Sequence, residues 1–138
     1  MNEPISAVLL DTDILSAVMR QHSAAWARAR AYLAVHHRLT FSIITRYEIL
    51  RGLHAKNATA QLAAFDQLCS VSTILPLTDA IVVRAAMIYA DLHRRGTLIG
   101  DADILIAATG LEQGLIVVTN NASHYQRVSG IQYDNWLT

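Results

Sequence analysis

Carboxylates stand at three places in this sequence where an apolar segment ends or a helix is predicted to begin. Asp11 and Asp13 follow the first apolar run, Glu48 lies soon after the second, and Asp101 and Asp103 open an apolar helical pattern. Carboxylate oxygens without cysteine ligands suit Mg²⁺ or Mn²⁺ rather than structural zinc. Such clusters commonly serve phosphoryl chemistry, because the metal activates water and stabilises charge on the phosphate oxygens. The first chemistry that these residues indicate is metal-assisted hydrolysis of a phosphate ester.

Asp11 is the stronger candidate of the first pair. A carboxylate directly after an apolar strand is costly to bury unless it is paired or metal-bound, so we interpret Asp11 as functional. Asp13 has a good structural interpretation, because it precedes Ile14 and Leu15 and can cap the next helix. We therefore treat Asp13 as a second-tier candidate.

Glu48 allows two interpretations. Thr45 and Glu48 have the three-residue spacing of a capping box, which predicts that a helix begins at Thr45 and slightly favours a structural role. This helix follows a strand, however, so Glu48 lies within one turn of the same sheet edge as Asp11. Tyr47 and Ile49 flank it, so its face is not plainly solvated.

Asp101 and Asp103 both lie in the first turn of a predicted helix that Gly100 precedes and Gly114 ends. Asp101 can cap this helix, and both acids gain from the positive N-terminal dipole. Asp103 shares a face with small and apolar residues further along, and a carboxylate on such a face requires a cation. The pattern favours Asp103 as functional and leaves Asp101 second-tier.

A fourth polar group follows the most apolar predicted strand of the chain. Thr119, Asn120 and Asn121 come directly after it, and two asparagines after a strand most often form a turn. By position they can also supply a neutral oxygen ligand or a phosphate contact. Among the arginines, Arg51 and three others are best placed to guide a polyanion, since arginine binds phosphate through two parallel hydrogen bonds. The other three are Arg46, Arg94 and Arg95.

Short apolar runs alternate with longer segments of helical periodicity along the chain. The runs predict five buried strands, at residues 5–10, 39–43, 73–75, 115–118 and 131–133. Ser23, Thr45 and Thr78 are predicted to begin or cap helices. Strand–helix alternation implies right-handed parallel crossovers, so we expect one α/β domain over residues 1–138, a three-layer α/β/α sandwich with a mostly parallel sheet of about five strands. Ligands of such sheets bind beyond the carboxyl ends of the strands, where all these polar groups would meet.

Composition excludes several other classes of protein. The 138 residues are 53% hydrophobic and only 16% charged, which excludes a disordered chain. Eleven acidic and eleven basic residues balance, so a strongly basic nucleic-acid module is not expected. Cys69 is the single cysteine, and we expect a cytoplasmic protein without signal peptide or membrane helix. The high apolar fraction indicates a protein partner.

The motifs taken together resemble the PIN-domain ribonucleases, in particular the VapC-type toxins of toxin–antitoxin modules. The resemblance runs nearly from end to end, in the family's order and spacing. It rests on residues 8–16 (VLLDTDILS), 42–52 (SIITRYEILRG), 99–108 (IGDADILIAA) and 118–121 (VTNN), then His124-Tyr125, Gly130 and Trp136.

The resemblance implies that Asp11, Glu48 and Asp103 are ligands of Mg²⁺ or Mn²⁺, and it favours Asp103 over its neighbour Asp101. Asn121, two residues after Thr119, matches a fourth catalytic position, and relatives carry Asp or Asn at that position. Asp13 stands where the family usually has Asn and could restore one negative charge.

The activity that the resemblance implies is that of an endoribonuclease toxin. Water activated by the metal attacks an RNA phosphodiester, often of a tRNA, and the 3′-oxygen leaves. The implied partners are the RNA, a second copy of the chain in a homodimer, and a small antitoxin that buries a segment near the site.

Two alternatives remain. A haloacid-dehalogenase-like phosphatase would use Asp11 and Asp13, but Leu15 stands where that motif has Thr or Val, and Lys56 is the only lysine. A non-catalytic PIN-type module that only binds RNA or protein is the other, and retention of the three acids argues against it.

Overall fold

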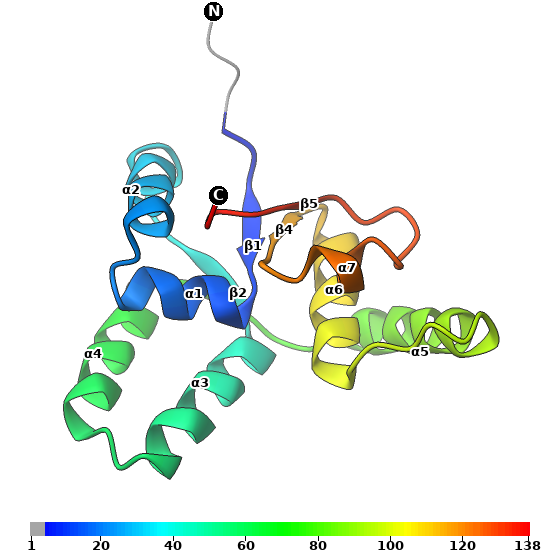
Figure 1. Cartoon of the computed structure of the whole chain (residues 1–138), viewed down its shortest axis with the longest axis horizontal. Coiled ribbons are helices and arrows are strands. Elements are labelled where there is room, and N and C mark those ends of the chain that lie inside the picture. The colour runs from blue at the N-terminus through cyan, green and yellow to red at the C-terminus, as the bar shows by residue number, and fades with distance from the viewer. Residues whose placement is uncertain (1–4) are drawn as a thin grey trace, which may run out of the picture.

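The computed structural model describes residues 5–138, and a five-stranded, all-parallel sheet lies at its centre (Figure 1). The strand order is β3-β2-β1-β4-β5, with β1 in the middle. The strands are β1 (Val8–Leu10), β2 (Thr40–Ser42), β3 (Thr73–Leu75), β4 (Ile116–Val118) and β5 (Tyr133–Asp134). Pairing of Leu9 with Val117 and of Phe41 with Ile74 sets the register on the two sides. The predicted α/β class and parallel sheet are confirmed.

Within residues 5–138, seven helices connect and cover these strands. They are α1 (Thr12–Met19), α2 (Ser23–His36), α3 (Ile43–Ala55), α4 (Thr59–Ser70), α5 (Asp79–Arg94), α6 (Asp101–Gln113) and α7 (Ala122–Tyr125). The Thr78 hydroxyl caps α5 by accepting from the Ile81 N–H, as predicted. Gly114 ends α6 with a φ of 66°, a left-handed conformation that glycine adopts without steric cost.

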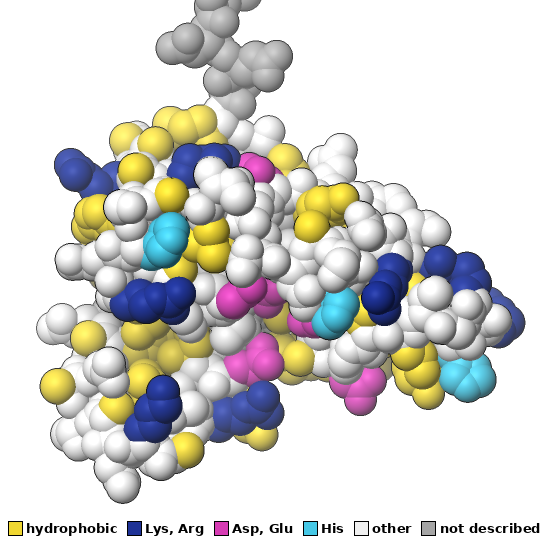
Figure 2. All heavy atoms as spheres, in the orientation of Figure 1, with side chains coloured by type: hydrophobic (Ala, Val, Ile, Leu, Met, Phe, Trp, Pro, Cys, Tyr) yellow, Lys and Arg dark blue, Asp and Glu magenta, His cyan; other side chains and the backbone are white. Residues whose placement is uncertain are grey.

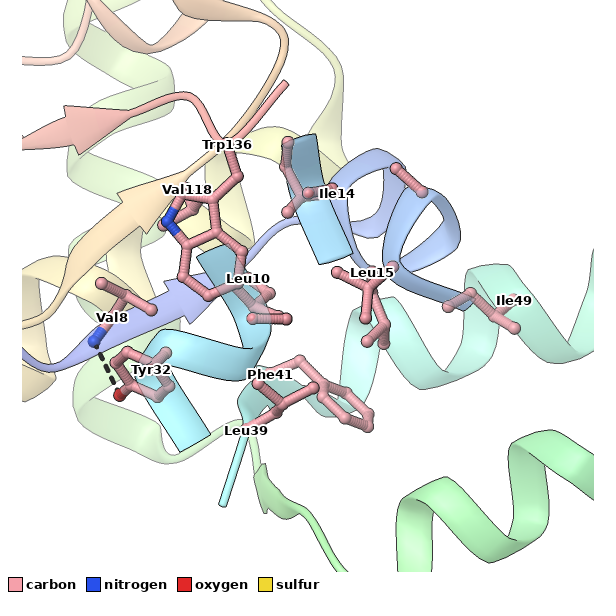
Figure 3. Packing of buried hydrophobic residues seen from close by; sticks show 14 of the residues in the cluster. Val8, Leu10, Ile14, Leu15, Tyr32, Leu39, Phe41, Ile49, Val118 and Trp136 are labelled. Atoms are coloured by element: carbon pink, nitrogen blue, oxygen red, sulfur yellow. Dashed lines mark hydrogen bonds between the residues drawn. The ribbon is translucent and has the colours of Figure 1, made fainter. Parts of the chain in front are cut away.

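Each face of the sheet carries its own hydrophobic core, because successive residues of a strand point to opposite faces. Leu10 belongs to one core with side chains of α1 to α4, and Leu9 to the other with side chains of α5, α6 and α7. Figure 3 shows the first core, where Trp136 from the C-terminal segment lies with Leu10, and the Val8 N–H donates to the buried Tyr32 hydroxyl at 3.1 Å. The predicted three layers are present.

Several predicted boundaries are wrong. The first strand covers residues 8–10 rather than 5–10, and the second and fourth are also shorter than predicted. The last strand is Tyr133–Asp134, and both its residues are exposed, because β5 is an edge strand with a neighbour on one side only. Residues 1–4 of the predicted domain lie outside the described residues.

Four predicted helix caps are also wrong, each by one to three residues. Ser42, not Thr45, caps α3, by accepting from the Ile44 N–H, so no capping box forms between Thr45 and Glu48. Asp11, not Asp13, caps α1 by accepting from the Thr12 N–H. Gly100 occupies the N-cap position of α6, and Asp101 follows it as the first helical residue. His22 precedes Ser23 as the cap of α2.

The strand order favours ligand binding at the edge of the sheet formed by the carboxyl ends of its strands. The chain passes from β1 toward β2 on one side of β1, while β4 pairs with β1 on the other. Such a reversal of strand order opens a crevice beyond the carboxyl ends of the two central strands. The segments that begin at Asp11, Ser42 and Thr119 all start at this edge. Over residues 5–138, no helix is long and apolar enough to cross a membrane.

Candidate functional site

Asp11 is the buried centre of the candidate site. It directly follows β1, is only 6% exposed, and its backbone N–H donates to the Val118 carbonyl of β4. Its Oδ2 accepts a 2.8 Å hydrogen bond from the hydroxyl of Thr119, which follows β4, and its Oδ1 accepts from the Thr12 N–H. The reversal of strand order thus joins the ends of β1 and β4 through one carboxylate.

The electrostatic surroundings of Asp11 disfavour its charge. The pKa of this carboxyl is raised from 3.8 to about 7. Burial is the largest cause, and the charges of Asp13 and Asp103 add to it, against the two hydrogen bonds that the carboxylate accepts. Burial also raises the pKa of Asp13, with Asp103 contributing in the same direction. The three aspartates therefore repel one another at neutral pH, and a cation between them would relieve that repulsion.

Glu48 is held by Thr12, the first residue of α1. It lies in α3, and its Oε1 accepts a 2.6 Å hydrogen bond from the hydroxyl of Thr12. The Thr12 hydroxyl also lies 3.1 Å from that of Thr45, which is fully buried. Because helix α3 begins at Ile43, Glu48 stands in its second turn and is oriented by α1 rather than by its own helix terminus.

Asp103 contacts a side chain of the segment that follows β4. The ring Nδ1 of His124 in α7 lies 2.7 Å from Asp103 Oδ2 and 2.7 Å from the side-chain nitrogen of Asn121. A ring nitrogen that faces a carboxylate donates its proton to it, so Nδ1 carries the hydrogen. α6 is the helix before β4 rather than after a strand, and its N-terminus reaches the same edge because it runs back against the sheet.

The second-tier residues occupy different places. Asp13 Oδ2 accepts from the Asn120 N–H at 3.3 Å, while its Oδ1 is buried with no hydrogen-bond partner among residues 5–138. Asp101 is exposed, on the rim of the site. Thr119 accepts from the Asn121 N–H while it donates to Asp11. Thr119 therefore links the buried carboxylate to the backbone at Asn121.

Only one of the four arginines singled out from the sequence has a described contact with a site acid. Arg51 lies 3.5 Å from Glu48 Oε2. Two of the others have different partners. Arg46 packs over Phe65 and contacts the Cys69 sulfur, and Arg95 pairs with Asp91 on α5. Figure 2 shows acidic side chains gathered in the middle of this face, with Lys and Arg side chains over α1 and α3 and a histidine on the α7 side.

A match to a family model covers nearly the whole described chain. The model is that of the PIN domain, and it matches residues 8–130. The chain belongs to the PIN-domain family. The resemblance seen in the sequence is confirmed, and the phosphatase interpretation, which needed a different fold family, is wrong.

Relatives of this PIN domain carry ribonuclease names. The tRNA(fMet)-specific endonuclease VapC of Salmonella typhimurium is 32% identical over 100 residues, covering 72% of this chain and 76% of the relative. Ribonuclease VapC1 of Haemophilus influenzae is 26% identical over 93% of this chain and 96% of its own. One chain of the structure of DNA-bound VapBC from Salmonella typhimurium superposes with a TM-score of 0.85, at 27% identity, over 96% of this chain and 99% of that one.

The donor set of this PIN domain fits a hard divalent cation. All its candidate ligands are oxygens, Asp11 is buried beside two further carboxylates, and a buried Asp13 oxygen lacks a partner. Within residues 5–138, no three His, Cys, Asp or Glu side chains converge on one point as they stand. Glu48 and Asp103 are instead engaged by Thr12 and His124, and each is still about a fifth exposed.

Sequence reasoning missed two residues of this site. The sequence assigns no separate role to Thr12, which lies between Asp11 and Asp13, yet its hydroxyl donates a hydrogen bond to Glu48. His124 enters the sequence analysis only as part of the C-terminal motif, with no role of its own, yet it contacts Asp103. Its place directly after the Asn121 segment was an available signal, since α7 begins at the same sheet edge.

Proposed function

We propose that this PIN domain is a metal-dependent endoribonuclease, the toxin of a VapC-type toxin–antitoxin pair, that hydrolyses phosphodiester bonds of RNA. The observation that carries the proposal is the buried carboxylate of Asp11 beside Asp13 and Asp103 at the carboxyl edge of the sheet. Its relatives are named ribonucleases, one of them specific for tRNA(fMet). A tRNA is therefore the substrate class to test first.

Asp11, Glu48 and Asp103 would hold Mg²⁺ or Mn²⁺ in this site. When bound, such an ion supplies an activated water and neutralises charge on the phosphate. Asn121 stands where a fourth, uncharged oxygen would complete the set, and Asp13 is the carboxylate that could compensate for its lack of charge. These ligand assignments rest on the all-oxygen donor set and on the crowding of the aspartates.

The remaining residues position this set. Thr119 holds Asp11 and orients the Asn121 backbone, and Thr12 holds Glu48. His124 holds Asp103 at 2.7 Å. Hydrogen bonds that hold a carboxylate ligand in this way fix its direction and typically contribute about ten- to a hundredfold to metal affinity or activity.

An apolar groove next to the acids suits the antitoxin. It has a volume of about 520 Å³, runs between α1, α3 and α4, and ends at Thr12 and Glu48. Its apolar lining includes Val18, Met19, Trp26, Leu53 and Leu68. An amphipathic segment of an antitoxin laid in this groove would reach the acids. Solved structures to which the chain is similar are those of VapBC from Salmonella typhimurium and VapBC-1 from Haemophilus influenzae, which supports this assignment.

The predicted homodimer stays a prediction. Helix α5 exposes large apolar side chains, Val82, Val83 and Met87 among them. An exposed apolar stripe of this kind supports a contact with another protein chain there, and it lies on the opposite layer from the groove.

The reaction class is tested by giving the purified protein two substrates. A tRNA(fMet) transcript and a generic phosphomonoester are each incubated with Mg²⁺, with Mn²⁺ and with EDTA. The proposal predicts discrete RNA fragments with either metal, none with EDTA, and no phosphate release from the monoester.

Other results would point to other functions. Phosphate release without RNA fragments would indicate a phosphatase. Retardation of the RNA on a gel without cleavage, unchanged by EDTA, would indicate a binding module, and either result would contradict the proposal.

A further inference from the structure

An exposed aromatic ring lies next to the catalytic acids on α3, and no part of the proposed reaction uses it. Tyr47 immediately precedes Glu48 and is 59% exposed, although tyrosine usually buries most of its ring. Ile43, one turn earlier on the same helix face, is exposed as well. The two side chains form an apolar strip along α3 that the described chain leaves uncovered.

A guanidinium group is stacked on this ring. The Arg51 guanidinium carbon lies 5.2 Å from the centroid of the Tyr47 ring, and its side chain is 60% exposed. Arg51 is also 3.5 Å from Glu48 Oε2, three residues before it, so the ring, the acid and the cation lie within about one turn of α3. A stack of this kind, four residues apart, adds modestly to helix stability, but stability does not require that it stand beside an active-site carboxylate.

The chemistry of this pair matches one nucleotide of single-stranded RNA. Proteins that bind single strands combine aromatic rings, on which bases stack, with cations that contact the backbone phosphates. Acidic residues dominate the centre of the site, so a polyanion needs a cation at the rim, and Arg51 provides it. The apolar groove that suits a protein segment lies on the other flank of Glu48, and neither Tyr47 nor Arg51 lines it.

We propose that Tyr47 and Arg51 form a nucleotide-binding subsite, in which an unpaired base next to the cleaved phosphodiester stacks on the Tyr47 ring and a flanking phosphate pairs with Arg51. The inference rests on the proposed ribonuclease function and names part of its RNA specificity. The subsite selects an unpaired base rather than a base sequence, because every base has a face that can stack.

Steady-state cleavage of a tRNA(fMet) transcript tests the stacking. Tyr47→Ala should raise KM by roughly tenfold with kcat within about twofold, and Tyr47→Trp should restore KM. Tyr89→Ala is the matched control, because Tyr89 is an exposed tyrosine stacked on His93 in α5, away from the acids. It should leave both constants unchanged. Thermal unfolding of each variant checks that the fold is retained.

An abasic scan of the RNA separates stacking from a structural role. After the cut has been mapped with the unmodified chain, abasic nucleotides replace the bases on either side of it, one at a time. At one position the difference between wild type and Tyr47→Ala should disappear, because the base that the ring contacts is already absent. A structural role for Tyr47 would leave the difference the same at every position.

Salt dependence tests the arginine. Arg51→Ala should reduce the slope of log KM against log salt concentration by about 0.7, the value of one phosphate contact to a single strand. Arg51→Lys should keep most of that slope.

The outcomes distinguish this inference from the proposed function. If wild type does not cut the transcript in metal, the proposed function is contradicted and the subsite falls with it. If wild type cuts and Tyr47→Ala keeps a wild-type KM, only the subsite is overturned. A wild-type KM with a changed molecular mass in sedimentation would assign Tyr47 to a contact between copies of the chain.

Discussion

The Thr119 hydroxyl lies 2.8 Å from Asp11 Oδ2, 108 positions away in the chain, and donates a hydrogen bond to it. Both residues are buried, and each is the first residue after a central strand. The same hydroxyl accepts from the Asn121 N–H. One side chain therefore connects the buried carboxylate with the fourth candidate position.

Replacing Thr119 should weaken the fold most when Asp11 is charged. Thr119→Val keeps the shape of the side chain but removes the donor, and a hydrogen bond to a charged group contributes about 1.5–3 kcal/mol. We expect the free energy of unfolding in EDTA to fall by about 2 kcal/mol at pH 8 and by less at pH 5, as measured by urea unfolding. Thr119→Ser retains the hydroxyl and should be closer to wild type at pH 8. Equal losses in both variants would mean that the hydrogen bond is not the cause.

Asp11 should make the metal-free protein less stable as the pH rises. Its pKa is about 7 in the folded chain against 3.8 for the unperturbed group, so between these values the folded state binds a proton that the unfolded state has lost. Folding stability therefore decreases through this window, by up to about 4 kcal/mol from this group, and levels off above pH 7.

Urea unfolding in EDTA at several pH values measures this loss. Asp11→Asn cannot ionise and should flatten the dependence between pH 4 and pH 7. A stability that rises with pH in wild type over this range would contradict the assignment.

A divalent cation should restore the stability that repulsion removes. Mn²⁺ at about a hundred times its dissociation constant should add roughly 3 kcal/mol to the free energy of unfolding at pH 8. The gain should be smaller at pH 5, where Asp11 is protonated, and it should be lost in Asp11→Asn. Scanning calorimetry with and without the ion provides the measurement. The same gain in Asp11→Asn as in wild type would place the ion elsewhere.

Two glycines within helices should respond in opposite directions to alanine. A Cβ at Gly110 in α6 would lie 2.7 Å from Val117 Cγ2 in β4, so Gly110→Ala should destabilise the fold by about 1–3 kcal/mol. Gly52 in α3 has open space around it, and Gly52→Ala should stabilise by up to about 1 kcal/mol. Thermal unfolding of both variants checks the contrast. A stabilised Gly110→Ala would show that α6 can move away from the sheet.

The layers of the fold could be predicted from the sequence, but the hydrogen bonds of the site could not. Apolar runs and helical periodicity determine which segments are strands and helices, and β3 was predicted to the residue. Strand ends and caps depend on local backbone conformation, so Asp13 was assigned the cap that Asp11 forms. The contact of His124 with Asp103 depends on how α6 and α7 pack, which no spacing within either segment reveals.

Neighbouring acids of α6 offer the most direct test of the central claim. Asp103 is half-buried and contacts His124, whereas Asp101 is exposed at the start of the same turn. The initial rate of tRNA(fMet) cleavage in Mn²⁺ is compared between wild type, Asp103→Asn and Asp101→Asn. Loss of a ligand should lower the rate by about a hundredfold or more in Asp103→Asn, with Asp101→Asn within a few fold of wild type. Equal rates for Asp103→Asn and wild type would contradict the proposed metal-dependent ribonuclease site.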